Sequence, residues 1–133
     1  MNTTNRFHDA GQLILRVGIS ALMMTHGWPK LQKLMAGGEI EFFDFMWMGP
    51  TVSLFLAVVG EFFAPLLIIF GYRTRWAALV SAFTMGVAAF YVHLGDPLGD
   101  REAALMYFIG FLAITLLGAG AWSVDAKLSA NND

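Results

Sequence analysis

Long apolar stretches alternate with short polar connections along the whole chain. The clearest stretch runs from Thr51 to Gly71 and carries a single charge, at Glu61. At about 1.5 Å rise per residue, a helix of this length matches a bilayer core of about 30 Å. Similar stretches lie at about 10–28, 76–94 and 101–117. The pattern predicts an all-α integral membrane protein, an antiparallel bundle of four transmembrane helices that forms one domain over residues 1–133.

The connection between the first two spans differs from the others. Pro29 is expected to end the first helix, because a proline ring clashes with the preceding turn. The segment from Lys30 to Gly49 then interleaves charged side chains with aromatic ones and is too polar to span. Such a segment is typical of the membrane interface or of a cover over the mouth of a bundle. The turn Tyr72–Arg75 is short, so the second and third spans are expected to be antiparallel neighbours.

Glu61 and Pro65 mark an irregular point inside the second span. A proline within a helix leaves the carbonyl four residues earlier without its usual donor, and here that carbonyl belongs to Glu61. An unpaired carboxylate at membrane depth costs at least about 2.5 kcal/mol. We therefore expect Glu61 to be protonated or paired inside the bundle, beside a locally broken backbone that faces protein or a wet cavity. Pro65 itself is a structural residue in this interpretation.

The composition agrees with a membrane protein and excludes several functions. Hydrophobic residues make up 57% of the chain, too many for a soluble domain of this size. The net charge of −2 gives no basic surface for nucleic acid. With no cysteine, the chain forms no disulfide, no cysteine-ligated centre and no covalently attached c-type haem. A redox role would therefore require a bound cofactor or a partner.

The distribution of basic residues bears on orientation. An even number of spans places both termini on one side, together with Arg73 and Arg75 in the turn between the second and third spans. Because basic residues are more frequent in cytoplasmic loops, this arrangement favours cytoplasmic termini. Trp122, just after the fourth span, is expected to anchor that interface, since tryptophan is enriched there.

Ionisable side chains inside or at the edge of the spans are the candidate site residues: Arg16, His26, Glu61, His93 and Glu102. Counted from the ends of their helices, Arg16 lies roughly 18 Å and Glu61 roughly 17 Å from the same side, which predicts an ion pair. The two histidines and Glu102 fall within about two turns of that side and are expected to meet at the mouth, above the pair. They are also the only plausible metal ligands, although no metal site is predicted. A b-type haem between the histidines would need a wide pocket, for which the chain has little room.

Each candidate also has a structural interpretation. The predicted Arg16–Glu61 pair would either bind an anionic or quinone-like ligand or simply fix the register of the helices. His93 would shuttle protons or form a hydrogen bond to a loop, and Glu102 would favour the positive end of a helix dipole. Lys30 is interpreted as a residue that extends its amine to the interface.

These residues, taken in order, resemble the DoxX family of small bacterial membrane proteins. The resemblance covers nearly the whole chain. The sequence departs from the family at Pro65, where the family more often has a glycine-rich helix, and at Ala121, where it often has arginine. The resemblance rests on Leu15-Arg16, His26-Gly27-x-x-Lys30, Gly49-Pro50, Gly60-Glu61, Gly71 with Arg73-Thr74-Arg75, His93, Glu102-x-Ala-Leu-x-Tyr107 and Gly118-x-Gly120-x-Trp122-Ser123-x-Asp125.

The resemblance implies a four-helix protein of the bacterial inner membrane. The family is named for a subunit linked to thiosulfate oxidation with quinone as acceptor, and other members are tied to oxidative stress. The first hypothesis is therefore a membrane subunit of a quinone-linked redox system, which binds a small ligand and works with a soluble or membrane redox partner. The alternatives are a non-catalytic scaffold with a structural Arg–Glu pair, and a transporter of a small solute or ion. Homo-oligomers would form through small-residue faces such as Gly60 and Ala64.

Overall fold

The computed structural model describes residues 3–132, and all regular secondary structure within that range is helical. This confirms the all-α prediction. The elements in chain order are α1 (Thr3–Ala36), η1 (Phe45–Trp47), α2 (Pro50–Val58), η2 (Val59–Phe63), α3 (Ala64–Phe70), α4 (Thr74–Val87), η3 (Ala88–Val92), α5 (Leu98–Leu117) and α6 (Val124–Ala130). The segments η2 and η3 are π-helical and continue the helices before them without a break, whereas η1 is a short 3-10 turn.

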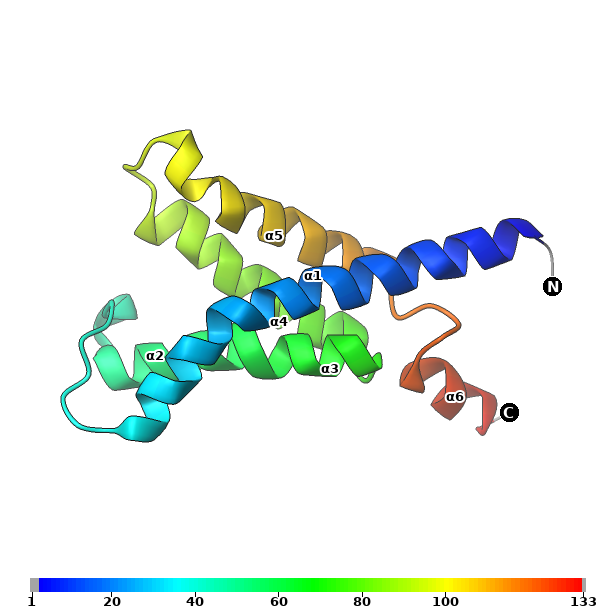
Figure 1. Ribbon diagram of the computed structural model, residues 1–133, viewed down its shortest axis with the longest axis horizontal. Coiled ribbons are helices and arrows are strands. Elements are labelled where there is room, and N and C mark those ends of the chain that lie inside the picture. Colours follow the sequence, from blue (N-terminus) through cyan, green and yellow to red (C-terminus); the bar gives the residue numbers. More distant parts are fainter. Residues whose placement is uncertain (1–2, 133) are drawn as a thin grey trace.

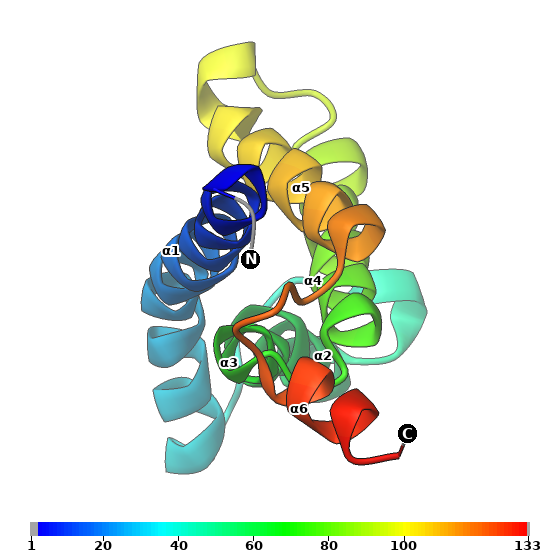
Figure 2. The same ribbon diagram turned by 90° about the vertical axis from the view of Figure 1, so that its right-hand side faces the viewer.

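The long helices lie along one another. α1 packs against α2, η2, α3 and α5, while α4 packs against α3, η2 and α5. Figure 1 shows the described N-terminal part and α6 at the same end of the molecule, and Figure 2 views that end. The loop between α1 and α2 and the turn between α4 and α5 lie at the opposite end, which we call the mouth end.

α1 is much longer than the sequence predicts. Its buried positions Gln12, Arg16, Ser20, Met23 and Gly27 recur every three or four residues, the spacing of one helical face. The expectation that Pro29 ends this helix is wrong, because the helix continues through Pro29 to Ala36. Proline is tolerated within long membrane helices where the freed backbone groups find other partners.

The second span is interrupted where the sequence predicts. Pro65 has no N–H, and in the π-helical segment before it the N–H of Ala64 donates to the carbonyl of Val59, five residues back. Because this turn pairs residues five apart, Pro65 withholds its donor from the Gly60 carbonyl and not, as the sequence predicts, from that of Glu61. The Gly60 carbonyl accepts a hydrogen bond from Ser81 Oγ of α4 at 2.8 Å. The acid and the irregular backbone therefore coincide, since Glu61 lies inside η2 and is buried.

A second interruption, η3, is not predicted by the sequence. The His93 N–H donates to the Ala88 carbonyl, again five residues back, at the end of α4. No proline marks this point. π-helical turns of this kind frequently occur at functional sites. η3 places His93 where the helix ends at the mouth end of the molecule.

Small side chains allow α4 to pack closely. The residues Ala77, Ser81, Met85 and Ala89, spaced four apart, are buried, and His93 four residues further on is half-buried. Such small residues let neighbouring backbones approach one another.

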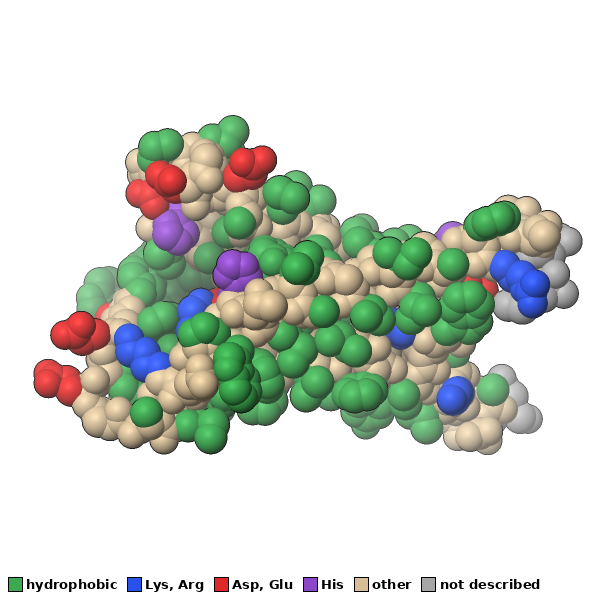
Figure 3. Space-filling view, in the orientation of Figure 1, with side chains coloured by type: hydrophobic (Ala, Val, Ile, Leu, Met, Phe, Trp, Pro, Cys, Tyr) green, Lys and Arg blue, Asp and Glu red, His purple; other side chains and the backbone are tan. Residues whose placement is uncertain are grey.

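Two helical stretches in the described part have the length and apolar character of a membrane span. They are Pro50–Phe70, with a mean hydropathy of 2.4, and Thr74–Val92, with a mean hydropathy of 1.4. The other two predicted spans lie on α1 and α5. Many large apolar side chains point outward from the middle of the molecule, as the green surface in Figure 3 shows.

Candidate functional site

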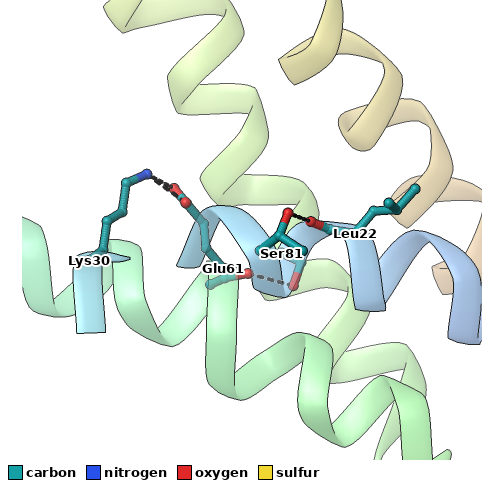
Figure 4. A network of polar contacts seen from close by, with 6 residues as sticks. Leu22, Lys30, Glu61 and Ser81 are labelled. Atoms are coloured by element: carbon teal, nitrogen blue, oxygen red, sulfur yellow. Dashed lines mark hydrogen bonds and ion pairs between the residues drawn. The ribbon is translucent and has the colours of Figure 1, made fainter. Parts of the chain in front are cut away.

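An ion pair between α1 and η2 lies at the centre of the site. Lys30 Nζ is 2.6 Å from Oε1 and 2.5 Å from Oε2 of Glu61, and Figure 4 shows the amine reaching across to both oxygens. The Glu61 side chain is only 5% exposed, whereas that of Lys30 is 32% exposed. The pairing satisfies the buried carboxylate, as expected for a charge at this depth. The interpretation of Lys30 as a residue that only extends to the interface is wrong.

Close contact between the two helices makes this pairing possible. A Cβ added at Gly27 would lie 2.4 Å from the carbonyl oxygen of Glu61, so only glycine fits there. Lys30 follows three residues later and therefore projects from nearly the same face of α1. The motif His26-Gly27-x-x-Lys30 combines the close approach with the amine that reaches Glu61.

The predicted pairing of Arg16 with Glu61 is also wrong. Arg16 lies against Gly71, where an added Cβ would touch its guanidinium group. Gly71 is ten residues beyond Glu61, which corresponds to about 15 Å along a helix. The depth count failed because it took Pro29 as the end of a helix that continues to Ala36.

Arg16 instead holds the loop that precedes α6. Its Nη1 donates to the carbonyl of Ala119 at 3.1 Å and its Nη2 to that of Trp122 at 2.7 Å. The Trp122 side chain is 49% exposed, as an interfacial anchor would be, but its backbone is tied to a buried arginine. Arg16 therefore acts here as a structural residue.

Asp125 completes this attachment. Its carboxylate accepts hydrogen bonds from the backbone N–H groups of Arg73 at 2.8 Å and Thr74 at 2.9 Å, and its own N–H donates to the Gly71 carbonyl at 2.8 Å. Burial alone would raise the pKa of Asp125, but the hydrogen bonds from Thr74 and Arg73 and the charge of Arg16 lower it below its ordinary value. The closing motif of the sequence thus fastens the C-terminal segment to the turn between α3 and α4.

A cavity of about 320 Å³ opens beside the ion pair, between α2 with η2 on one side and α4 with η3 on the other. Phe43 and Phe45 of the loop between α1 and α2 both pack edge-to-face on Tyr91, with ring centroids 5.8 and 5.7 Å apart. The aromatic segment therefore covers part of the bundle, one of the two roles that the sequence suggests. The lining is mostly apolar and includes Phe42, Phe43, Phe45, Ser53, Leu56, Ala57, Val80, Phe83, Thr84 and Val87.

A second cavity, of about 230 Å³, lies on the other side of the same pair. Its own lining residues come from α1, α4 and α5 and include Met23, His26, Met85, Asp100, Ala103, Ala104 and Tyr107. Lys30, Glu61, Ala88 and His93 line both cavities. The Lys30–Glu61 pair is therefore part of the wall that the two cavities share.

The predicted group at the mouth is only partly formed. His26 packs edge-to-face on Tyr107 with ring centroids 5.6 Å apart, and His93 Nδ1 lies 2.7 Å from Asp96 Oδ2. Both histidines line the smaller cavity, but Glu102 is exposed and lines neither. Asp100, an exposed residue in the first turn of α5, lines the smaller cavity where Glu102 was expected.

Metal binding finds no support in this geometry. Within residues 3–132, no group of three or more His, Asp or Glu side chains is arranged to hold a metal ion. His26, His93 and Glu102 therefore form no ligand set in the described structure.

Comparison with known proteins finds one matching family and several similar bacterial proteins. A family model described as DoxX matches residues 11–94. The inner membrane protein YqjF of Escherichia coli (strain K12) is 30% identical to the chain, over 93% of this chain and 96% of its own. The inner membrane protein YphA of the same organism is 29% identical, over 96% of this chain and 100% of its own. A Bacillus subtilis (strain 168) protein named "Putative oxidoreductase CatD" is 26% identical over 91% of this chain and 89% of its own. No solved structure matches the chain.

Proposed function

The chain belongs to the DoxX family, and we propose that it is a multi-pass protein of the bacterial inner membrane with four transmembrane helices and both termini in the cytoplasm. Its relatives named inner membrane proteins and its outward-facing apolar residues support this proposal. Ile14 and Leu116, on α1 and α5, are 72% and 78% exposed. A surface of this kind is unfavourable in water and favourable in lipid.

We further propose that the protein is a membrane subunit of a quinone-linked redox system, which binds its ligand in the larger cavity. The observation that carries this proposal is the Lys30–Glu61 pair in the wall of a mostly apolar, aromatic-lined cavity. An aromatic ring fits such a lining, while a few polar groups orient the ligand. The name of the Bacillus subtilis relative supports the redox part of the proposal.

The residues present fit a quinone. Lys30 offers an N–H donor to a ring carbonyl, and Glu61 offers a carboxylate that holds or releases a proton. The phenylalanines of the loop would shield a bound ring from water, and an apolar tail would extend through the outward-facing side of the cavity. A bound quinone would supply the electron-accepting group that the chain lacks, and a soluble or membrane partner would supply the electrons.

Equilibrium binding tests this proposal directly. Purified protein in detergent is titrated with ubiquinone-1 by calorimetry, together with Glu61→Gln and the control Glu102→Gln, which changes an exposed carboxylate outside both cavities. We expect Glu61→Gln to weaken binding at least about tenfold, which corresponds to about 1.4 kcal/mol, and the control to bind like the wild type. Equal affinity in all three proteins, or no binding to the wild type, would reject the proposal.

A scaffold function is the second candidate, and the Arg16 network favours it. Both Nη groups of Arg16 donate to backbone carbonyls, which supports a structural role for a buried charge in this chain. If the Lys30–Glu61 pair serves the same purpose, the double variant Lys30→Met/Glu61→Gln should fold and should keep the same companion proteins in a pull-down. Loss of ubiquinone-1 binding in a well-folded double variant would favour the redox proposal instead.

A further inference from the structure

The larger cavity faces outward, toward the proposed lipid. Its walls include Leu56, Val80 and Phe83, which are 42%, 41% and 65% exposed. α2 and α4 come together through η2 and α3, and the cavity lies where the two helices separate toward the mouth end. A molecule dissolved in the bilayer could therefore reach Glu61 sideways, between these helices.

The smaller cavity has a different character. It lies at the mouth end, among α1, η3 and the first turns of α5, and is lined by the titratable side chains of His26, His93, Asp100 and Tyr107. Figure 3 shows a hollow between α1 and the α4–α5 end, with histidine, lysine and acidic side chains at its edge. A space of this size, lined in part by these polar side chains, holds several waters, because one water occupies about 30 Å³.

Glu61 is the residue that both cavities share with Lys30. Its carboxylate is 5% exposed and bonds to the lysine amine, so neither cavity passes freely into the other at this point. Buried carboxylates in membrane proteins commonly mark proton relays. Here the carboxylate lies between a mostly apolar cavity and a second cavity with more titratable side chains in its lining.

We propose that the smaller cavity is a water-filled path that carries protons to Glu61 from the mouth end, separate from the apolar cavity through which a membrane-dissolved ligand enters. This inference rests on the proposed membrane topology and ligand site. A proton that leaves the Glu61 carboxyl for a ligand oxygen is replaced through the His26 and His93 side of the wall. The site thereby exchanges protons with the side opposite the termini.

Two carbodiimides of different solubility test the separation. A water-soluble carbodiimide and the membrane-soluble dicyclohexylcarbodiimide both activate a carboxyl group, and modification at Glu61 is read by mass spectrometry of its peptide. The first product is an O-acylisourea adduct on Glu61. Attack by the Lys30 amine then forms an amide between the two residues and releases the carbodiimide as its urea, which leaves the peptide lighter by the mass of one water. The experiment uses the full chain in proteoliposomes, with Glu61→Gln as the unreactive reference.

One substitution blocks each cavity. Ala104→Phe fills a position that lines only the smaller cavity, and Ala57→Phe fills one that lines only the larger. We expect Ala104→Phe to slow modification by the water-soluble reagent at least about tenfold, about 1.4 kcal/mol, and to leave the membrane-soluble reagent unaffected. Ala57→Phe should slow modification by the membrane-soluble reagent and leave the water-soluble reagent unaffected. Circular dichroism confirms that both variants remain helical.

The outcomes separate this inference from the proposed function. If the two variants affect both reagents alike, or if the water-soluble reagent does not reach Glu61 in the wild type, separate paths are refuted even when ubiquinone-1 binds. If the reagents separate as expected while ubiquinone-1 fails to bind, the two-path site stands and the quinone proposal falls.

Discussion

Removal of either member of the Lys30–Glu61 pair should destabilise the fold, and by unequal amounts. Lys30→Met leaves the Glu61 carboxylate without its partner at 5% exposure, whereas Glu61→Gln leaves an amine that is 32% exposed and can turn toward water. Breaking a buried pair costs about 3–5 kcal/mol, and leaving a partly solvated group unsatisfied costs about 1–3 kcal/mol. The lysine variant should therefore be the less stable of the two.

The double variant decides whether the pair itself is responsible. Lys30→Met/Glu61→Gln removes both charges, so its loss of stability should fall short of the sum of the single losses by about 1–3 kcal/mol. Unfolding in mixed micelles with increasing SDS measures each free energy. Lys33→Met is the matched control, since Lys33 bonds only to an exposed carbonyl, that of Glu41. Additive losses, or equal losses for Lys30→Met and Lys33→Met, would refute this reasoning.

Three further predictions concern packing and electrostatics. Gly27→Ala forces α1 away from η2 and should cost about 1–3 kcal/mol of unfolding free energy, whereas Gly18→Ala, with open space around it, should be neutral or slightly stabilising. Ser81→Ala leaves the buried Gly60 carbonyl without its donor and should cost about 1–3 kcal/mol in the same unfolding assay. An unchanged free energy of unfolding would mean that this hydrogen bond does not stabilise the fold. Because the folded pKa of Asp125 is lowered, its contribution is complete above the ordinary value of 3.8 and is lost as the pH falls through the folded pKa. The stability difference between wild type and Asp125→Asn should therefore shrink on acidification, and a difference that grows would contradict this sign.

The sequence predicts features whose cause is local. The period of the apolar residues gives the helices, and the spacing of Pro65 from Glu61 gives the irregular backbone beside a buried acid, because one proline removes one particular hydrogen bond. The spacing of four residues likewise places Ala77, Ser81, Met85 and Ala89 on one buried face.

Features that depend on relative depth are not predictable in this way. An error of seven residues at the end of α1, from Pro29 to Ala36, was enough to pair Glu61 with the wrong cation. The sequence does contain the correct signal, because Gly27 and Lys30 occur together, but their role appears only once Gly27 is seen against the Glu61 carbonyl. The second π-helical segment, η3, contains no proline that would predict it from the sequence, and it contacts α5.

The C-terminal motif illustrates the same limit. Trp122, Ser123 and Asp125 are recognisable as a pattern, yet their spacing does not reveal that Arg16 and the α3–α4 turn are their partners. The contacts of Arg16 join residues about a hundred positions apart in the sequence. Patterns of spacing along one helix do not predict contacts at such a separation. The assignment of Arg16 to structure therefore comes from the three-dimensional arrangement alone.

Photoaffinity labelling tests the central claim, that the ligand binds beside the Lys30–Glu61 pair. The full chain in proteoliposomes is illuminated with a photoreactive ubiquinone analogue, with and without excess ubiquinone-1, and the adducts are located by mass spectrometry. If the ligand binds there, adducts form within residues 42–45, 53–61 and 80–93, and excess ubiquinone-1 suppresses them. Adducts spread along the outer faces of α1 and α5, or adducts that ubiquinone-1 leaves unchanged, would contradict it.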